Sequence, residues 1–185
     1  MPDIVAETER LVLRTVGEGD EAEHARLLNS ATIMRHIGGP MEPADIEQRH
    51  AKQMASQAAH GFSFVFAIEK ATGEMVGYLG IKRVENPRAP NVGDHEIGWK
   101  IREDRWRRGY AEEAMRAVLE WALDRLRLPY VVALTSEANE GSWRLMEKLG
   151  MARRPDLDFE DPDYPPEDRR TIQYSLTAQD WRAAR

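Results

Sequence analysis

Three consecutive segments near the middle of the chain constrain its fold more than any other feature. HEIGWKI, at residues 95–101, has the pattern of a strand, and YVVALT, at 130–135, is almost wholly apolar. Between them, residues 111–127 carry apolar side chains at intervals of three and four, as on one face of a helix. A strand, a helix and a strand in this order predict a βαβ unit. The apolar last strand predicts parallel pairing, with both of its faces buried.

Patterns on both sides of this unit predict one α+β domain, a mixed and strongly twisted sheet flanked by helices. Residues 62–84 predict two strands joined by a turn at Thr72 and Gly73, and residues 42–61 predict a helix that ends at Gly61. We further expect strands at 8–16 and 169–177, helices at about 20–30 and within 139–151, and a loop in the acidic, proline-rich segment 156–168. With no repeat and no linker, residues 1–185 are expected to form a single domain.

Composition excludes several classes of function. The net charge of −6 argues against a protein that coats nucleic acid or an anionic membrane, and favours a cationic or neutral small partner. The chain has no cysteine, so disulfides, thiolate metal sites and a cysteine nucleophile are excluded. No apolar run approaches the roughly 20 residues of a membrane helix, and the acidic N-terminus is unlike a signal peptide, so we expect a cytoplasmic protein.

The stretch RWRRGYAEEA, at residues 105–114, raises a question of charge. Three arginines stand just before Gly109 and the start of the helix, where the helix dipole already supplies partial positive charge. Cations there are unfavourable unless an anion joins them or Glu112 and Glu113 pair with them. Free backbone N–H groups and several guanidinium groups suit a ligand with more than one phosphate. The spacing matches neither a P-loop nor the dinucleotide fingerprint.

This stretch resembles the phosphate-binding turn of the GCN5-related N-acetyltransferases, whose pattern is Gln/Arg-x-x-Gly-x-Gly/Ala. Gly109 and Ala111 match its last two fixed positions, and Trp106 stands where Gln or Arg is usual. Trp at that position is similar to the ribosomal-protein-alanine acetyltransferase branch. HEIGWKI resembles the fourth strand of that branch, and NEGSWRLMEKLGM resembles its Asn-x-x-Ser signature. With the TERLVLR opening and the YSLTAQDW ending, the resemblance covers nearly the whole chain in the family's order.

The resemblance implies acetyl coenzyme A as co-substrate, wedged between splayed central strands, and direct transfer of its acetyl group to a primary amine. The acceptor is then a protein N-terminus or a small amine. The positions that match the family's cofactor contacts are the strand end Trp99, Lys100 and Ile101, the turn Arg107, Arg108, Gly109, Tyr110 and Ala111, and the later pair Asn139 and Ser142.

Glu96 is the leading candidate for the base that deprotonates the amine. Strand alternation puts it on the same face as Gly98 and Lys100, and a ligand can lie beside the small glycine. The alternative is a solvated carboxylate or a partner of Lys100. His95 is the second candidate, although a lone histidine on an apolar face is more often structural. His95 and Glu96 point to opposite faces and no metal-binding spacing exists, so we predict no metal.

Ser142 is a candidate for helping the thiolate of coenzyme A to leave. The alternative is that Ser142 merely fills the first turn of a helix that Asn139 caps. Many members of the family carry a tyrosine acid four residues after the serine, where this chain has Met146, so no general acid is assigned.

Two other functions stay open. The chain could be a non-catalytic sensor or partner subunit that binds acetyl-CoA, a reading that Met146 favours, or a protein that binds ATP through its arginines. The acidic loop is expected to be solvated surface, with a lip that attracts a cationic amine as the alternative. A homodimer is also left open.

Overall fold

The computed structural model describes residues 1–185, and the chain divides into two compact units. One contains Met1–Gly80 and Trp99–Trp121, and the other contains Ile81–Gly98 and Ala122–Arg185. Strands β4 (Met75–Arg83) and β5 (His95–Ile101) each run from one unit into the other. Both units combine strands with helices, in accord with the predicted mixed class. That residues 1–185 form one domain stays a prediction.

The strands of the first unit pair antiparallel in chain order. They are β1 (Ile4–Glu7), β2 (Leu11–Arg14), β3 (Phe64–Glu69) and the first part of β4. The predicted hairpin is confirmed, and its turn contains Gly73 at a φ of +72°. Strand β1 was not predicted, because it has only four residues and one of them is buried, which is too little for an alternating pattern.

The helices of the first unit are α1 (Asp20–Leu28), α2 (Ala31–Met34), α3 (Pro43–His60) and α4 (Tyr110–Leu119). Helix α3 begins with a proline, which lacks the N–H that would have no partner there, and it ends at Gly61 in the left-handed conformation, as predicted. The short α2 was not predicted, because a single turn leaves no periodic signal. Ser30 caps it by accepting a hydrogen bond from the Ile33 N–H.

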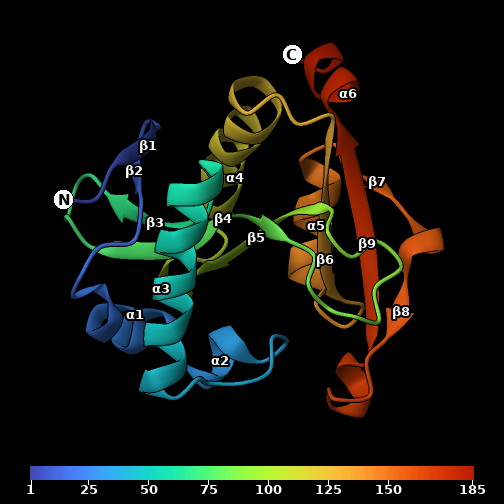
Figure 1. Ribbon diagram of the computed structural model, residues 1–185, viewed down its shortest axis with the longest axis horizontal. Helices are drawn as coiled ribbons and strands as arrows, with labels where there is room; N and C mark the ends of the chain where they lie inside the picture. The colour runs from blue at the N-terminus through green and yellow to red at the C-terminus, as the bar shows by residue number, and fades with distance from the viewer. The chain divides into compact units, whose positions relative to one another are not determined.

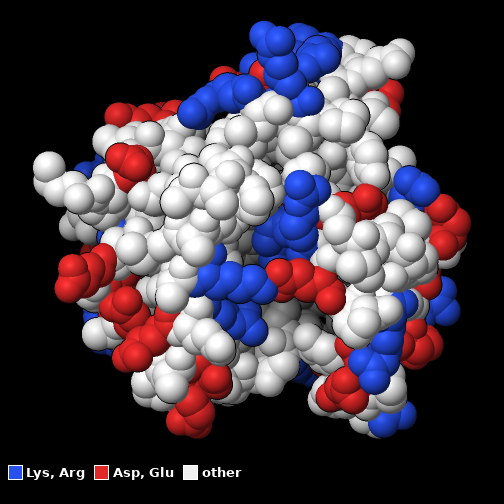
Figure 2. All heavy atoms as spheres, in the orientation of Figure 1, with Lys and Arg blue, Asp and Glu red and all other residues white.

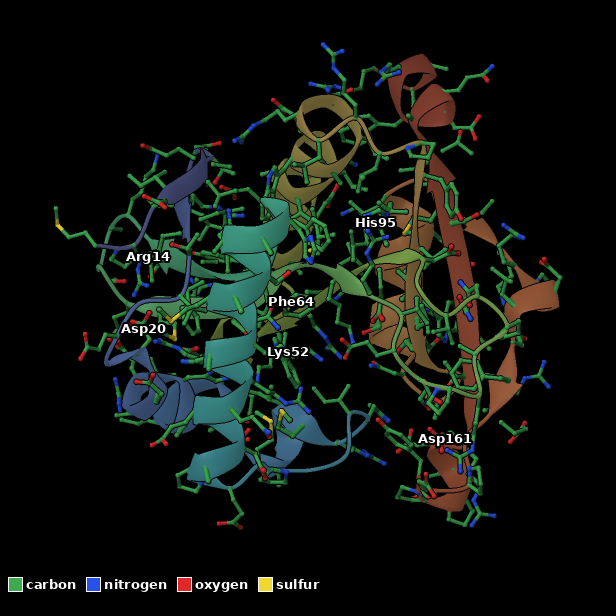
Figure 3. All side chains as sticks on the ribbon, in the orientation of Figure 1. Arg14, Asp20, Lys52, Phe64, His95 and Asp161 are labelled. Atoms are coloured by element: carbon green, nitrogen blue, oxygen red, sulfur yellow. The ribbon has the colours of Figure 1, made fainter.

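Helix α1 packs on the first unit's sheet through an apolar cluster, and His50 of α3 contacts the rings of Phe66 and Tyr78. Leu28 of α1 lies among Phe66, Met75 and Tyr78 of the hairpin, and α3 is drawn across these strands with α1 near one end (Figure 1). The entry into α1 is fixed by charge, because Arg14 at the end of β2 pairs with Asp20 through two hydrogen bonds of 2.7 and 2.8 Å (Figure 3). Asp20 also accepts the Gly17 N–H.

Helix α4 is shorter than the helix predicted at 111–127. It ends as an α-helix at Leu119, and the chain continues as a π-helical stretch, Glu120–Arg125. Of the five apolar positions of the predicted helix face, Met115, Val118, Leu119 and Ala122 are fully buried and Leu126 is half-buried. The apolar periodicity was therefore correct for burial, but it does not distinguish an α-helical from a π-helical turn.

The second unit is built around β9 (Arg170–Thr177). Strand β6 (Tyr130–Ser136) pairs antiparallel with it along seven positions, and two short strands, β7 (Ala152–Arg153) and β8 (Phe159–Glu160), also pair with it. Strand β6 pairs parallel with β5, with Glu96 opposite Val132, so the predicted parallel pairing is confirmed. Figure 1 shows β9 in red at the centre of this unit.

The two helices of the second unit are α5 (Glu140–Lys148) and α6 (Ala178–Ala183). Helix α6 is held by Asp124, which accepts hydrogen bonds from Trp181 at 3.0 Å and from Arg185 at 2.9 Å. Basic side chains gather where α6 lies (Figure 2).

The acidic segment at 156–168 was expected to be solvated surface, but part of it is buried. Asp161 and Asp168 are 3% and 4% exposed, because Asn86 donates to the first and Ser136 to the second. Asp158 pairs with Arg153. The segment also contains β8 and two 3₁₀ turns. These two buried carboxylates accept hydrogen bonds from residues far away in the sequence, and composition alone does not reveal such pairing.

No helix in this structure combines the length and the apolarity that crossing a lipid bilayer requires.

Candidate functional site

The turn Trp106–Gly109 connects a 3₁₀ turn, Glu103–Arg105, to the start of α4. Arg107 has a φ of +56° and Gly109 a φ of +81°, so two left-handed residues alternate with ordinary ones. None of the N–H groups from Arg107 to Ala111 is paired with an acceptor in the chain. Successive free N–H groups at a helix N-terminus form a concave anion site.

The three arginines of the turn have different surroundings. Arg105 is bound by two carboxylates, Glu69 at 2.8 Å and Asp104 at 2.6 Å. Arg107 is exposed, and no acidic side chain pairs with it. Arg108 is also exposed and donates only to the Asp104 carbonyl, at 3.2 Å. Arg107 and Arg108 therefore keep their charge available, whereas Arg105 does not.

The two glutamates of the first turn of α4 do not neutralise these arginines. Glu113 accepts Arg10 Nε at 2.6 Å, and Glu112 accepts Arg116 at 2.9 Å. The alternative in which Glu112 and Glu113 pair with the arginines of the turn is therefore wrong, and the positive charge of Arg107 and Arg108 has no partner within the chain.

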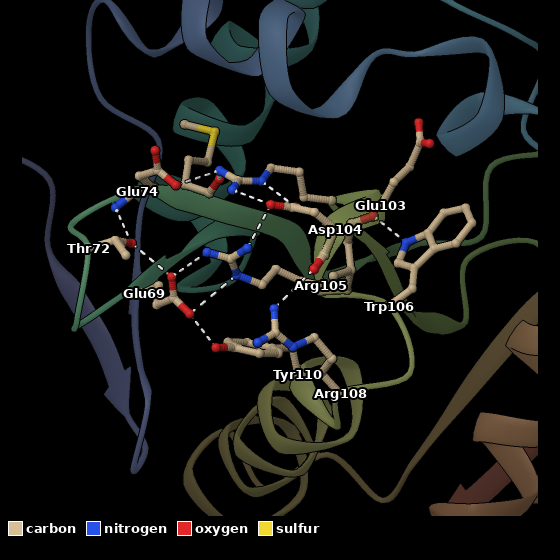
Figure 4. A network of polar contacts seen from close by, with 12 residues as sticks. Glu69, Thr72, Glu74, Glu103, Asp104, Arg105, Trp106, Arg108 and Tyr110 are labelled. Atoms are coloured by element: carbon tan, nitrogen blue, oxygen red, sulfur yellow. Dashed lines mark hydrogen bonds and ion pairs between the residues drawn. The ribbon is translucent and has the colours of Figure 1, made fainter.

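Tyr110, the first residue of α4, is 6% exposed and its hydroxyl donates to Glu69 (Figure 4). Its side chain is thus part of the packing behind the turn. The predicted cofactor contacts at Tyr110 and Ala111 involve the backbone, whose N–H groups are the ones left free. The nearest atom to a Cβ added at Gly109 is Arg10 Nη2 at 3.4 Å, an ordinary contact, so the role of this glycine is conformational, since glycine adopts its φ without strain.

At the end of β5, just before the turn, the Ile101 carbonyl already accepts a hydrogen bond. The Trp106 indole N–H donates to the Ile101 carbonyl at 2.7 Å, which holds an indole that is 44% exposed against the end of β5 (Figure 4). Ile101 is buried and Trp99 half-buried. The predicted backbone contacts at Trp99, Lys100 and Ile101 stay predictions.

Lys100 points into the first unit. Its Nζ lies 3.6 Å from Met34 Sδ and 5.5 Å from the centre of the Tyr78 ring. Burial, followed by the charge of Arg49, lowers the pKa of Lys100 to about 7. The Lys100 ammonium group has no carboxylate partner. The alternative in which Glu96 pairs with Lys100 is therefore wrong.

Glu96 lies in β5 of the second unit and is 9% exposed. Its carboxylate faces Lys82 of β4, with Oε2 and Nζ 3.3 Å apart. Burial raises the pKa of Glu96, and Lys82 opposes part of that rise. A buried carboxylate with a raised pKa is a better base near neutral pH than an exposed one. The expectation of a solvated carboxylate is wrong.

His95, the second candidate for the base, lies at the start of β5 (Figure 3). Its Nδ1 is 3.3 Å from Arg83 Nη1. Burial and the charge of Arg83 lower the pKa of His95, so the ring is neutral at pH 7. A cation beside it disfavours the imidazolium that a base must become.

Asn139 and Ser142 lie at the start of α5, and both are half-buried. Asn139 occupies the N-cap position, as predicted, but its side chain accepts no hydrogen bond from the helix. Neither side chain has a hydrogen-bond partner in the chain. Met146 is 1% exposed, which makes that position part of the core rather than a place for an acid.

Sequence reasoning missed Glu69 and Arg10, which hold the turn from behind. Both lie at strand ends, where charged side chains are common, and their partners are 36 to 103 positions away in the chain. No local pattern marks them. No group of three or more His, Cys, Asp or Glu side chains is arranged to hold a metal ion.

The chain matches a family model described as an acetyltransferase (GNAT) domain over residues 10–152. It is 30% identical to the uncharacterized protein YkkB of Bacillus subtilis over 147 residues, which cover 78% of this chain and 83% of YkkB. Among solved structures, it is similar to an acetyltransferase from Agrobacterium tumefaciens, with a TM-score of 0.76 and 27% identity over 92% of each chain. Ribosomal-protein-S5-alanine acetyltransferase from Vibrio fischeri shares the fold, with a TM-score of 0.72 and 16% identity over 95% of this chain and 97% of that one.

Proposed function

The chain belongs to the GNAT family of acetyltransferases, and on that premise we propose that it is an acetyl-CoA-dependent N-acetyltransferase that moves the acetyl group directly to a primary amine. The observation that carries the proposal is the turn Trp106–Gly109, where free N–H groups and two unpaired arginines meet at a helix N-terminus.

The turn suits the phosphates of coenzyme A in chemistry as well as in charge. A pyrophosphate presents several acceptor oxygens, and the N–H groups from Arg107 to Ala111 lack acceptors. Gly109 leaves room for close approach, and the guanidinium groups of Arg107 and Arg108 can reach further phosphate oxygens. We propose Asn139 and Ser142 as further contacts, because their polar side chains are not used within the chain.

Glu96 is proposed as the base. An alkyl amine is mostly protonated at neutral pH, and it must lose a proton before it attacks the thioester. Burial raises the pKa of Glu96 toward the working range, which improves its match to that task. As nitrogen bonds to the acetyl carbon and the carbon–sulfur bond breaks, the proton passes to the Glu96 carboxylate, directly or through water.

Departure of the thiolate is assigned to Ser142 or to water. The Ser142 hydroxyl has no partner in the chain and is free to donate, whereas Met146 carries no proton to give. Tyr130 and Tyr174 of the same unit donate to Asp94 and Glu147, so their hydroxyls are already in use. The acceptor is proposed to be a protein N-terminus or a small amine, in keeping with the net charge of −6.

The test is release of free coenzyme A from acetyl-CoA in the presence of small amines and N-terminal peptides. Wild type is compared with Glu96→Gln and with a control, Glu23→Gln, whose carboxylate is 42% exposed on α1. We expect one acceptor class to stimulate release and Glu96→Gln alone to weaken it. Tight binding of acetyl-CoA without stimulated release by any acceptor would favour the sensor function, and failure to bind acetyl-CoA would refute the proposal.

A further inference from the structure

One carboxylate reaches both ends of the phosphate-binding turn. Glu69 is the last residue of β3, and its side chain is 8% exposed. It accepts hydrogen bonds from Arg105 Nη2 at 2.8 Å and from the Tyr110 hydroxyl (Figure 4). Arg105 immediately precedes the turn, and Tyr110 immediately follows it. The four residues between them are thus fixed at both ends from one point.

The carboxylate of Glu69 is fully used by these contacts. Arg105 Nε donates to it at 3.3 Å, and Thr72 Oγ1 donates at 2.8 Å from the hairpin turn. Hydrogen bonds from Arg105 and then from Tyr110 lower the pKa of Glu69 to about 2. The carboxylate is therefore charged at neutral pH, and its four hydrogen bonds leave no lone pair for a ligand. Its role is to hold its donors.

A second contact fixes the middle of the turn. Arg10 Nη1 donates to the Arg108 carbonyl at 2.9 Å, while Arg10 Nε pairs with Glu113. The Arg10 guanidinium also stacks on the Tyr110 ring, 4.1 Å from its centre. A carbonyl of the turn is thereby held away from the anion site, while the N–H groups stay free.

We propose that Glu69, supported by Arg10, is a positioning residue that holds the N–H groups of residues 107–111 in place for the phosphates of coenzyme A. The inference rests on the proposed function of the turn. The inference also extends that proposed function, because Glu69 lies in the β3–β4 hairpin, outside every segment that carries the family resemblance. In this role Glu69 acts on the turn and not on the substrate. Preorganised N–H groups bind an anion without the cost of ordering them on binding. Glu69 accordingly governs affinity for the phosphate-bearing part of the cofactor and leaves the acyl-transfer step unchanged.

The test is Glu69→Gln, which keeps the shape and removes the charge that holds Arg105. We expect the Kd for coenzyme A, measured by calorimetry, and the KM for acetyl-CoA to rise about tenfold or more, with kcat nearly unchanged. Turnover of acetylated pantetheine, which lacks the phosphates, should be equal in wild type and variant. A general structural defect would lower both activities.

The matched control is Glu74→Gln. Glu74 belongs to the same polar network and pairs with Arg102 at 2.9 Å, but it reaches neither end of the turn (Figure 4). We expect its affinity for coenzyme A to equal that of wild type. Should Glu69→Gln fold poorly, Tyr110→Phe removes only the hydrogen bond at the second end and should still weaken binding several-fold. Unchanged Kd in the folded Glu69 and Tyr110 variants would overturn the inference, whereas failure of wild type to bind coenzyme A would overturn the proposed function instead.

Discussion

His24 Nδ1 and His50 Nε2 lie 2.7 Å apart inside the first unit, where the two rings share one hydrogen bond. Both rings are buried and stack with their centres 5.0 Å apart. One ring nitrogen must donate and the other must accept, so at least one ring is neutral. Burial, followed by the charge of Lys100, lowers the pKa of His24 to about 2, and burial also lowers the pKa of His50, although Glu21 and Asp20 oppose it.

This pair predicts a loss of stability in mild acid. Below about pH 6.5 the unfolded chain binds a proton at His24 that the folded chain excludes, so the free energy of unfolding falls as pH decreases. At pH 5 the loss is about 2 kcal/mol for one such histidine. Carboxylates whose pKa is lowered by partners, such as Glu69, reduce the free energy of unfolding only below about pH 4.5, where the unfolded chain begins to protonate them.

Urea unfolding at pH 7.5 and pH 5 tests this prediction, with His24→Gln as the comparison. The variant carries no titrating ring at position 24, so its stability should differ less between the two pH values than that of wild type. An equal difference in both proteins would place the acid sensitivity elsewhere.

Glu96→Gln should lower turnover and raise stability together. Folding raises the pKa of Glu96, so the folded chain binds this proton more strongly than the unfolded chain, and stability falls as pH rises above about 4.5. At pH 8 the buried Glu96 carboxylate is charged at a cost in folding free energy, and an amide in its place removes that cost. Loss of the general base reduces kcat roughly hundredfold or more. Thermal unfolding at pH 8 and initial rates measure the two effects. A variant that is both inactive and less stable would contradict the assignment.

Arg107→Ala should weaken binding of coenzyme A about tenfold without affecting the fold, because its guanidinium is exposed and has no partner within the chain. The loss should shrink as salt concentration rises, since screening weakens an exposed contact to phosphate. Arg144→Ala, which removes an exposed arginine paired with Glu140 on α5, serves as the control. Calorimetric titration at two salt concentrations would show an unchanged Kd for Arg107→Ala if Arg107 does not contact phosphate.

Gly80→Ala should destabilise the protein by more than about 2 kcal/mol. Gly80 has a φ of +151°, and an added Cβ would lie 2.3 Å from the Ser63 carbonyl oxygen and 2.7 Å from Phe64 Cα. Both atoms belong to the neighbouring backbone, which cannot move aside without breaking the β3–β4 pairing. Gly141→Ala is the contrasting case, because nothing lies within 4 Å of its added Cβ, and it should be neutral or stabilising. Equal midpoints in urea for the two variants would refute the argument.

Much of the fold could be predicted because its signals are local. The turn at Thr72 and Gly73, the helix end at Gly61 and the apolar face of α4 each depend on residues within a few positions of one another. Strand β1 and helix α2 were missed because each has only four residues, too few for a clear alternating or helical pattern.

The candidate site was predictable only as far as its motifs extend along the chain. The motif around Gly109 identified the turn, but it could not distinguish Arg105, which Glu69 binds, from Arg107, which is unpaired. That distinction depends on a carboxylate 36 residues earlier. The same limit applies to Asn139, where a good capping residue occupies the cap position without using its side chain. Which of these residues contact the cofactor stays a prediction.

The anchored carboxylates of the acidic segment have a consequence for its susceptibility to proteases. Its composition of acids and prolines is typical of a flexible tail, yet Asp161 and Asp168 are buried and tie the chain to Asn86 and Ser136 at two points seven residues apart. A protease cuts where the chain is exposed and free to move, and the two anchors leave only short pieces of the segment free. The segment should therefore stay intact in the folded protein, and the first cut there would report that one of the two anchors had opened.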